Sequence, residues 1–221
     1  MLNELITMRK PKSHAAEAFR TLRTNIQFSL IDKEVKTILV TSSQPNEGKS
    51  TVVSNLAITF AENNKKVLLI DCDLRKPTIH KNFSLSNTEG LTSLVAKEKD
   101  FQECIKNSNV NNLYILCSGP IPPNPSEILG SEKLKYLLKE LSQMFDVILF
   151  DAPPILAVTD AQILSTLSDG VVFVASFGEV TKHAIVRAKE LIDKVGGRML
   201  GVVMNKVPDK SKNYYYKYDY R

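Results

Sequence analysis

Short apolar runs of strand character alternate along this chain with stretches in which apolar residues recur every three or four positions. Six runs are rich in Val, Ile and Leu, which is typical of buried strands. They cover residues 35–41, 66–71, 113–117, 146–151, 170–176 and 199–205. Helical patterns cover residues 13–28, 51–62, 126–144 and 181–195, with short helices at 90–96 and 101–106. This alternation predicts an α/β fold, a mostly parallel sheet flanked by helices with right-handed crossovers.

Two of the predicted helices start at capping residues. Ser13 can cap helix 13–28, because a serine hydroxyl accepts a hydrogen bond from the first turn of a helix. Thr159 and Gln162 are predicted to form a capping box after strand 146–151. Residues 1–12 are expected to be a loose lead-in.

Three charged residues of the first predicted helix share one face. Glu17, Arg20 and Arg23 are spaced three apart, so they can pair within the helix. Taken alone, the same spacing is also typical of a solvated charged face.

A phosphate-binding loop is predicted between the first strand and the second helix. Residues 43–51 read Ser-Gln-Pro-Asn-Glu-Gly-Lys-Ser-Thr, and they match the end of the pattern G-x-x-x-x-G-K-[ST]. In such loops consecutive backbone N–H groups curl around a polyphosphate, the lysine reaches the β- and γ-phosphates, and the hydroxyl can bind Mg²⁺. The match is incomplete because Ser43 replaces the first glycine. The alternative is a polar turn that happens to contain Gly-Lys-Ser.

Three acidic residues end predicted strands at the edge where open α/β sheets bind ligands. Asp71 and Asp73 follow the run 66–70, where they could serve Mg²⁺ or accept a proton. Asp71 could alternatively cap the following turn. Asp151 follows four apolar residues, as in the Walker B pattern, in which the carboxylate reaches Mg²⁺ directly or through water.

Composition narrows the class of protein. The net charge of +5 among 221 residues is carried mainly by the two ends, so nucleic-acid binding is not expected. No membrane span or signal sequence is recognisable, which predicts a cytoplasmic protein. The three cysteines are odd in number and lack metal-ligand spacing, so they are expected to be structural residues in a reducing compartment. They are Cys72, Cys104 and Cys117.

The C-terminal stretch is rich in tyrosine. Residues 213–221 hold five of the seven tyrosines, show no hydrophobic periodicity and should be mobile. They form either a low-complexity end or a set of acceptor hydroxyls for a phosphoryl transferase. The five are Tyr214, Tyr215, Tyr216, Tyr218 and Tyr220.

Together these stretches resemble the bacterial tyrosine kinases of capsule and exopolysaccharide synthesis. Residues 17–23 are similar to the E-x-x-R-x-x-R oligomerisation motif of the family, and residues 67–77 to its second Walker-type motif, A′. Residues 119–126 and 150–154 also resemble family strings, although Ala152 stands where threonine is usual. The resemblance covers nearly the whole chain and implies a P-loop NTPase-like fold of the MinD/ParA kind.

The resemblance also implies roles for individual residues. Lys49 and the loop would hold the phosphates of ATP, and Ser50 and Asp151 would bind Mg²⁺, with Asp73 helping through water. Asp71 would accept the proton of tyrosine, with Lys49 and Asp73 as its catalytic partners. Asn205 would read the adenine edge, unless it is only a turn residue. The implied nucleotide-binding set is Pro45, Asn46, Glu47, Gly48, Lys49, Ser50, Thr51 and Asn205.

Partners follow from the resemblance as well. Glu17, Arg20 and Arg23 would join subunits into a ring in which one tail enters the next active site, and Arg75 would face a neighbouring subunit. A membrane activator with a cytoplasmic C-terminal segment would recruit the chain to the inner face of the membrane. A cognate tyrosine phosphatase and substrates such as polysaccharide-pathway enzymes are implied too. Residues 1–207 would form the kinase domain and 208–221 a flexible tyrosine tail.

Two other functions fit parts of the sequence. A MinD/ParA-type switch ATPase shares the fold class, but such proteins usually carry a lysine near the start of the loop, where residues 42–44 are Ser-Ser-Gln. A non-catalytic nucleotide-binding regulator would tolerate Asp71→Asn, whereas a kinase would not.

Overall fold

The computed structural model describes residues 5–29, 35–97 and 101–208. Within these ranges a seven-stranded sheet has the order β3-β4-β2-β5-β1-β6-β7. The strands are β1 (Thr37–Ser42), β2 (Val67–Asp71), β3 (Ile105–Asn107), β4 (Leu113–Leu116), β5 (Val147–Asp151), β6 (Gly170–Ser176) and β7 (Met199–Asn205). The helices are α1 (Ile6–Arg9), α2 (His14–Gln27), α3 (Lys49–Glu62), α4 (Ile79–Asn82), α5 (Leu91–Lys97), α6 (Phe101–Cys104), α7 (Pro125–Leu129), α8 (Glu132–Met144), α9 (Asp160–Ser165) and α10 (Lys182–Lys194).

The sheet is parallel except at one edge. Every neighbouring pair from β4 to β7 runs parallel, which confirms the predicted α/β fold. β3 pairs antiparallel with β4. The prediction of a helix over residues 101–106 was therefore wrong at its end, because Ile105 and Lys106 pair with β4 instead of continuing α6.

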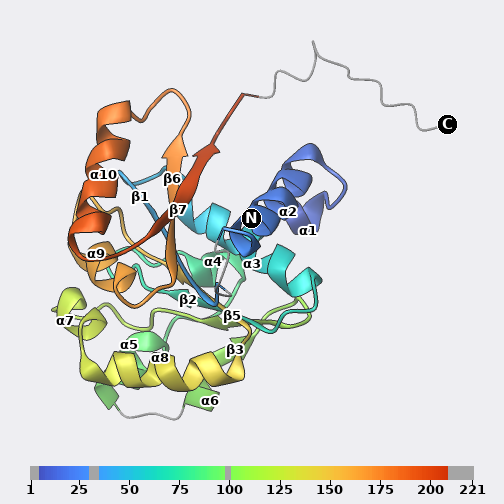
Figure 1. The fold of residues 1–221 in the computed structure, drawn as a ribbon. Coiled ribbons are helices and arrows are strands. Elements are labelled where there is room, and N and C mark those ends of the chain that lie inside the picture. The colour runs from blue at the N-terminus through green and yellow to red at the C-terminus, as the bar shows by residue number, and fades with distance from the viewer. Residues whose placement is uncertain (1–4, 30–34, 98–100, 209–221) are drawn as a thin grey trace.

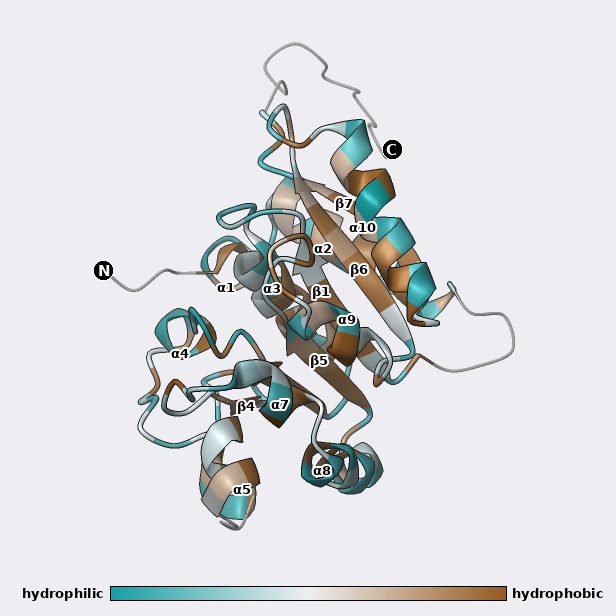
Figure 2. Ribbon diagram, turned by 90° about the vertical axis from the view of Figure 1, so that its left-hand side faces the viewer, coloured by the Kyte–Doolittle hydropathy of each residue, from teal (hydrophilic) through white to brown (hydrophobic). Residues whose placement is uncertain are grey.

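Helices cover both faces of the sheet (Figure 1). One buried cluster gathers apolar side chains from α5, α8, α9 and α10, and the other gathers those of α2 and α3. Successive residues of β5 alternate between them, with Ile148 and Phe150 in the first and Val147 and Leu149 in the second. In Figure 2 the strands are mainly hydrophobic, whereas α8 and α10 carry both colours, as expected for helices with one face on a core.

Residues 5–12 of the N-terminal lead-in are ordered, contrary to the prediction of a loose segment. Leu5 and Thr7 are buried, and Thr7 donates from both its backbone N–H and its hydroxyl to Oδ1 of Asn55, at 3.0 and 2.9 Å. α1 therefore packs on α3. A tertiary partner, which local pattern does not reveal, fixes this segment.

Helix boundaries were predicted with mixed success. The Ser13 cap is confirmed, since its hydroxyl accepts from the N–H of Ala16 at 3.2 Å. The helix predicted over 126–144 is broken, because α7 ends at Leu129 with Gly130 as its C-cap, and Ser131 caps α8. The predicted capping box of Thr159 and Gln162 was wrong. The backbone of Thr159 is already helical, and the Thr159 side chain makes no capping hydrogen bond.

The register of the central strands brings the predicted acidic residues together. Asp71 at the end of β2 lies opposite Asp151 at the end of β5, and Asp151 also lies opposite Val40 of β1. The loop between β1 and α3 follows directly. α3 is buried from Val52 to Ala61, so the sheet holds the start of this helix firmly against the carboxylates.

Candidate active site

The phosphate loop is closed by a glycine that no other residue could replace without movement. Gly48 has φ 89° and stands at the N-cap of α3. A Cβ at this position would lie 2.2 Å from Nδ2 of Asn205. That amide nitrogen donates to the carbonyl oxygen of Glu47 at 2.8 Å. The end of β7 therefore supports the loop, and the amide nitrogen of Asn205 is engaged there.

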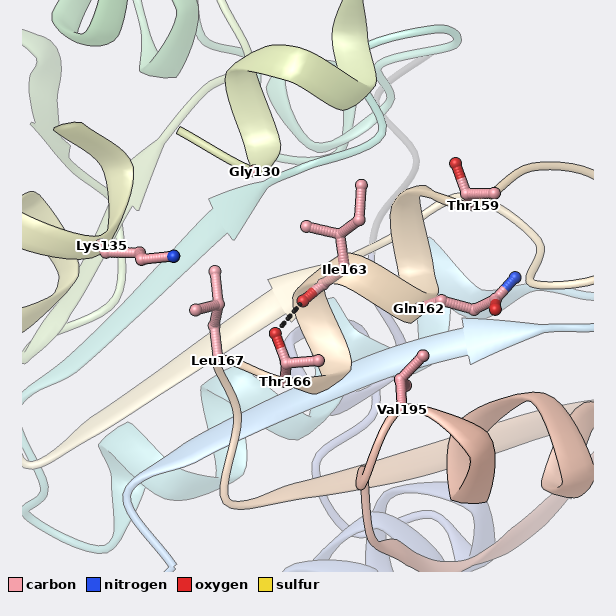
Figure 3. A pocket seen from close by; sticks show the side chains of 8 residues that line it. All are labelled: Gly130, Lys135, Thr159, Gln162, Ile163, Thr166, Leu167 and Val195. Atoms are coloured by element: carbon pink, nitrogen blue, oxygen red, sulfur yellow. Dashed lines mark hydrogen bonds between the residues drawn. The ribbon is translucent and has the colours of Figure 1, made fainter. Parts of the chain in front are cut away.

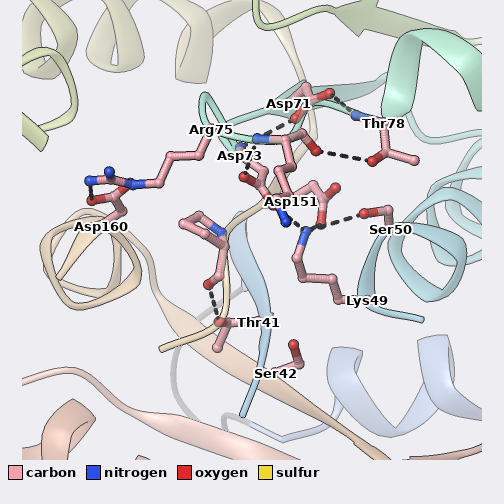
Figure 4. A network of polar contacts seen from close by, with 12 residues as sticks. Thr41, Ser42, Lys49, Ser50, Asp71, Asp73, Arg75, Thr78, Asp151 and Asp160 are labelled. Atoms are coloured by element: carbon pink, nitrogen blue, oxygen red, sulfur yellow. Dashed lines mark hydrogen bonds and ion pairs between the residues drawn. The ribbon is translucent and has the colours of Figure 1, made fainter. Parts of the chain in front are cut away.

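The lysine of the loop lies among carboxylates (Figure 4). Nζ of Lys49 is 2.9 Å from Oδ2 of Asp73 and 3.2 Å from Oδ1 of Asp151. It also lies 3.2 Å from the hydroxyl of Ser50. Burial disfavours the ammonium, but the charges of Asp151 and Asp73 outweigh it and hold the pKa of Lys49 above its ordinary value. The loop cation is thus already paired before any ligand is considered.

Asp71 lies behind this group and is fully buried. Its Oδ1 accepts from the N–H of Asp73 at 3.2 Å, and its Oδ2 accepts from those of Thr78 and Ile79 at 3.0 Å each. These contacts are the turn-capping arrangement that the sequence left open. Burial, and next the charge of Asp151, raise the pKa of Asp71 to about 8 despite these donors, which makes it a stronger proton acceptor than an ordinary aspartate.

Asp151 has one oxygen without a partner. It is completely buried, and Oδ2 has no hydrogen-bond partner among the described residues. Burial raises its pKa. A hydroxyl and carboxylate oxygens are the donors that Mg²⁺ prefers, and Mg²⁺ usually keeps waters and substrate phosphates as its other ligands. Ser50, Asp73 and Asp151 therefore fit this ion, although no group of three or more His, Cys, Asp or Glu side chains suited to a metal occurs in the described part.

A cavity of about 570 Å³ opens in front of these residues. Its lining includes most of the predicted nucleotide-binding residues together with Asp73. Four of the predicted site residues are not among those that line this cavity: Glu47, Asp71, Asp151 and Asn205. The sequence missed the remaining wall, which is made by Arg75, Lys76, Thr78, Pro153, Pro154, Ala157, Val158 and Lys206.

A second cavity, of about 390 Å³, lies beside α9 (Figure 3). It is lined mainly by uncharged residues such as Thr159, Ile163 and Leu167. Lys135, on its rim, pairs with Glu132 at 2.7 Å. This hollow gathers no convergent charged groups and is not the candidate active site.

An ion pair that the sequence did not predict crosses the wall of the first cavity. Nε and Nη2 of Arg75 donate to the two carboxylate oxygens of Asp160 at 2.9 and 3.1 Å, and the Ser126 hydroxyl donates to the same carboxylate at 2.7 Å. The pair joins the segment after β2 to the start of α9 (Figure 4). The sequence does show an arginine in the A′ segment, at position 75. It does not show the partner of this arginine, because Asp160 lies 85 residues further along the chain.

The three charged residues of α2 have different surroundings. Arg20 pairs with Glu17 at 2.9 Å, as predicted. Arg23 instead donates from Nη1 to the carbonyl oxygen of Thr59 on α3 at 2.9 Å. Glu17 is more exposed than its partner Arg20: 67% of the Glu17 side chain is accessible, against 29% for Arg20. The five predicted acceptor tyrosines, Tyr214 to Tyr220, lie outside the described residues.

Comparisons with known proteins agree with this geometry. A family model described as an AAA domain matches residues 35–199. The chain is 48% identical over 205 residues to tyrosine-protein kinase YwqD of Bacillus subtilis (strain 168), covering 93% of this chain and 86% of the relative. It is 43% identical over 210 residues to the putative tyrosine-protein kinase CapB of Staphylococcus aureus, covering 95% and 92%.

The chain is also similar to solved structures. The crystal structure of the chimerical protein CapA2B2 superposes with a TM-score of 0.90 at 40% identity, covering 94% of this chain and 92% of that one. The septum site-determining protein MinD of Pyrococcus horikoshii OT3, complexed with Mg-ADP, has a TM-score of 0.66 at 22% identity over 76% and 69% of the two chains. That second likeness shows a shared fold and no more, whereas the relatives of higher identity establish the family. The chain belongs to the bacterial tyrosine kinases, as its sequence predicted, and is an enzyme of the protein-tyrosine kinase class.

Proposed function

We propose that this chain transfers the γ-phosphoryl group of Mg²⁺-ATP to tyrosines of its own C-terminal cluster, in trans, and thereby regulates capsular or exopolysaccharide synthesis and export. The observation that carries the proposal is the contact of Lys49, which lines the 570 Å³ cavity, with Asp73 and with the buried Asp151. A paired cation and carboxylates beside a phosphate loop are what phosphoryl transfer requires, because that reaction depends mostly on positioning and charge neutralisation.

Each residue has a stated role in the proposal. Backbone N–H groups of the loop around Gly48, together with Lys49, bind the β- and γ-phosphates. Ser50 and Asp151 would hold Mg²⁺, with Asp73 helping through water, and the ion would supply neutralisation of the charge that develops on the phosphates. Asn205 supports the loop through Glu47 and contributes to the adenine end of the site.

Asp71 accepts the phenolic proton as the tyrosine oxygen bonds to the γ-phosphorus and the bond to the leaving ADP oxygen breaks. Because its pKa is raised to about 8, Asp71 is a stronger base than an ordinary aspartate, but only its ionised form can take the proton from a phenol with a pKa near 10. Asp71 is fully buried, so the proton reaches it only if the segment of Asp73 moves aside or relays it. Comparing Asp71→Asn with Asp73→Asn separates the two carboxylates.

The position of the residues that precede the tail supports its proposed role as acceptor. β7 ends at Asn205, which holds the phosphate loop, and Lys206 lines the cavity. Residue 208, the last of the described residues, therefore follows two positions after a residue that lines the cavity. Because 13 residues can span roughly 40 Å when extended, the chain's own site is also within reach. Transfer in trans has to be tested directly.

Assembly and location complete the proposal. Glu17, Arg20 and Arg23 join copies into a ring that phosphorylation opens, since each phosphate adds about 1.5 to 2 negative charges. A membrane protein with a cytoplasmic C-terminal segment activates the chain and recruits it from the cytoplasm to the inner face of the membrane. A cognate phosphatase reverses the reaction, and polysaccharide-pathway enzymes are further substrates. No helix in the described part is long and apolar enough to cross a membrane.

The test combines mass spectrometry with mixed variants. A chain lacking residues 209–221 is incubated with full-length Lys49→Met and Mg²⁺-ATP, with and without the cytoplasmic segment of a membrane protein encoded nearby. Phosphate on Tyr214–Tyr220 of the Lys49→Met chain is the expected result, and it can arise only in trans. Phosphotyrosine formed by wild-type chain but never on Lys49→Met would contradict transfer in trans. ATP consumption without phosphotyrosine would favour the MinD/ParA-type switch ATPase.

A further inference from the structure

A buried glutamate occupies the inside of the phosphate loop. Glu47 is 3% exposed, and its carboxylate turns back to the start of the loop. Oε2 accepts from the N–H of Ser43 at 3.0 Å, while Oε1 accepts from the Ser43 hydroxyl at 2.5 Å and from the N–H of Gln44 at 3.2 Å. One side chain thus receives three hydrogen bonds from the two residues at which the loop begins.

The same residue is held from the other side. Its carbonyl oxygen accepts from Nδ2 of Asn205 at 2.8 Å. The residues on either side of Glu47 have positive φ angles, 68° at Asn46 and 89° at Gly48. Asparagine adopts positive φ more readily than most residues other than glycine. The contacts of Glu47 restrain the bend that these two residues make.

This arrangement accounts for the missing first glycine of the motif. Ser43 is 1% exposed, and its hydroxyl and its N–H both bind the glutamate. In the usual motif the first glycine gives the backbone the freedom to close the loop. Here the side chain of Glu47 closes the loop by binding Ser43. The N–H groups of Ser43 and Gln44 are consumed by the carboxylate, so the groups left for a phosphate lie further along, near Gly48 and the start of α3.

We propose that Glu47 is a positioning residue that pre-forms the phosphate loop and so sets the affinity for the β-phosphate of a nucleotide, without touching the nucleotide. The inference rests on the proposed function, in that a nucleoside diphosphate or triphosphate binds this loop. A pre-organised loop loses less conformational freedom on binding, and hydrogen bonds to an ionised acceptor are the stronger kind.

Glu47→Gln is the matched variant, because it preserves volume but turns an NH₂ group toward donors. Binding of ADP and of AMP, both with Mg²⁺, is measured by calorimetry, and thermal unfolding is recorded without nucleotide. We expect Glu47→Gln to weaken ADP about tenfold, the equivalent of one buried charge-assisted hydrogen bond left unmade, and to change AMP less than about twofold, since AMP lacks the β-phosphate. Glu190→Gln, on the exposed side of α10, is the control and should bind both like wild type.

Two more variants sharpen the result. Ser43→Ala removes the hydroxyl bond and keeps the backbone N–H donor, and it is expected to weaken ADP by less than Glu47→Gln does. The double variant should bind ADP no more weakly than Glu47→Gln alone, because both changes act on the same contact. Wild-type ADP affinity in Glu47→Gln, or equal losses for ADP and AMP with a lower melting temperature, would overturn the inference. Failure of the wild-type chain to bind ADP would instead overturn the proposed function.

Discussion

The ammonium of Lys49 lies 2.9 Å from the carboxylate of Asp73. The two residues belong to different motifs, the phosphate loop and the segment after β2, and only 11% and 7% of their side chains are exposed. Asp151 contacts the same ammonium. Without a ligand the lysine therefore neutralises carboxylates, and a nucleotide must compete with them for it. Stability and activity consequently depend on the same few atoms.

Asp71 should make the folded chain less stable as the pH rises. In the folded state burial raises its pKa from 3.8 to about 8. Between those values the folded chain holds a proton that the unfolded chain has lost, so the free energy of unfolding falls as pH increases from about 4 to about 8. Denaturant unfolding of nucleotide-free chain across this range should give a shallower decline for Asp71→Asn than for wild type. Equal slopes in both chains would assign the titration to another group; Asp193→Asn, on the surface, is the control.

Replacing Lys49 should harm the fold as well as the reaction. Lys49→Met leaves Asp73 and Asp151 without their cation, and breaking such a buried pair costs about 3 kcal/mol. The loss should be smaller at pH 5 than at pH 8, because burial raises the pKa of Asp151 and a protonated Asp151 needs no cation. Lys49→Arg keeps the charge and should retain more stability, while its fork cannot reproduce the contacts of an ammonium. Chemical unfolding and phosphotyrosine formation, measured on both variants, check this; a fully stable Lys49→Met chain at pH 8 would count against it.

Arg75 should matter through Asp160, which is completely buried. Arg75→Ala removes two charge-assisted hydrogen bonds and leaves Asp160 with the Ser126 hydroxyl. We expect a loss of about 1–2 kcal/mol of unfolding free energy, and Arg75→Ala/Asp160→Asn should be less unstable than the sum of the single variants. A double-mutant cycle by denaturant unfolding measures this coupling. Strict additivity would mean that the contact contributes little.

Substitutions at Glu17 and at Arg23 should have different effects, the first on the assembly of copies and the second on the stability of the single chain. Arg23 donates to the carbonyl oxygen of Thr59 within the same chain, so Arg23→Ala should lower the unfolding free energy by about 1 kcal/mol. Glu17 is exposed, and Glu17→Ala should change that free energy by less than about 0.5 kcal/mol while altering the assembly. Sedimentation together with thermal unfolding distinguishes the two effects. An unchanged assembly in Glu17→Ala would contradict the proposed ring contact.

Local pattern was sufficient for much of this molecule. Apolar strands alternating with helices predicted the parallel sheet, because burial on both faces leaves a continuous apolar run in the sequence. The Gly-Lys-Ser string and the acids after the runs at 66–70 and 147–150 predicted which loop and strand ends would meet. Those residues meet because the carboxyl ends of parallel strands share one edge of the sheet.

Only the tertiary structure decided the contacts that join distant residues. The Asn55 partner of Thr7, the pairing of β3 with β4, the Asp160 partner of Arg75 and the support of Glu47 by Asn205 each depend on side chains or strands brought together by the sheet order. The inward turn of the Glu47 carboxylate likewise follows from its burial. Sequence spacing records the periodicity of a helix or strand, whereas such contacts arise from packing, which no local pattern encodes. The sequence by itself determined the family, the sheet and the loop, and packing decided how that loop is held.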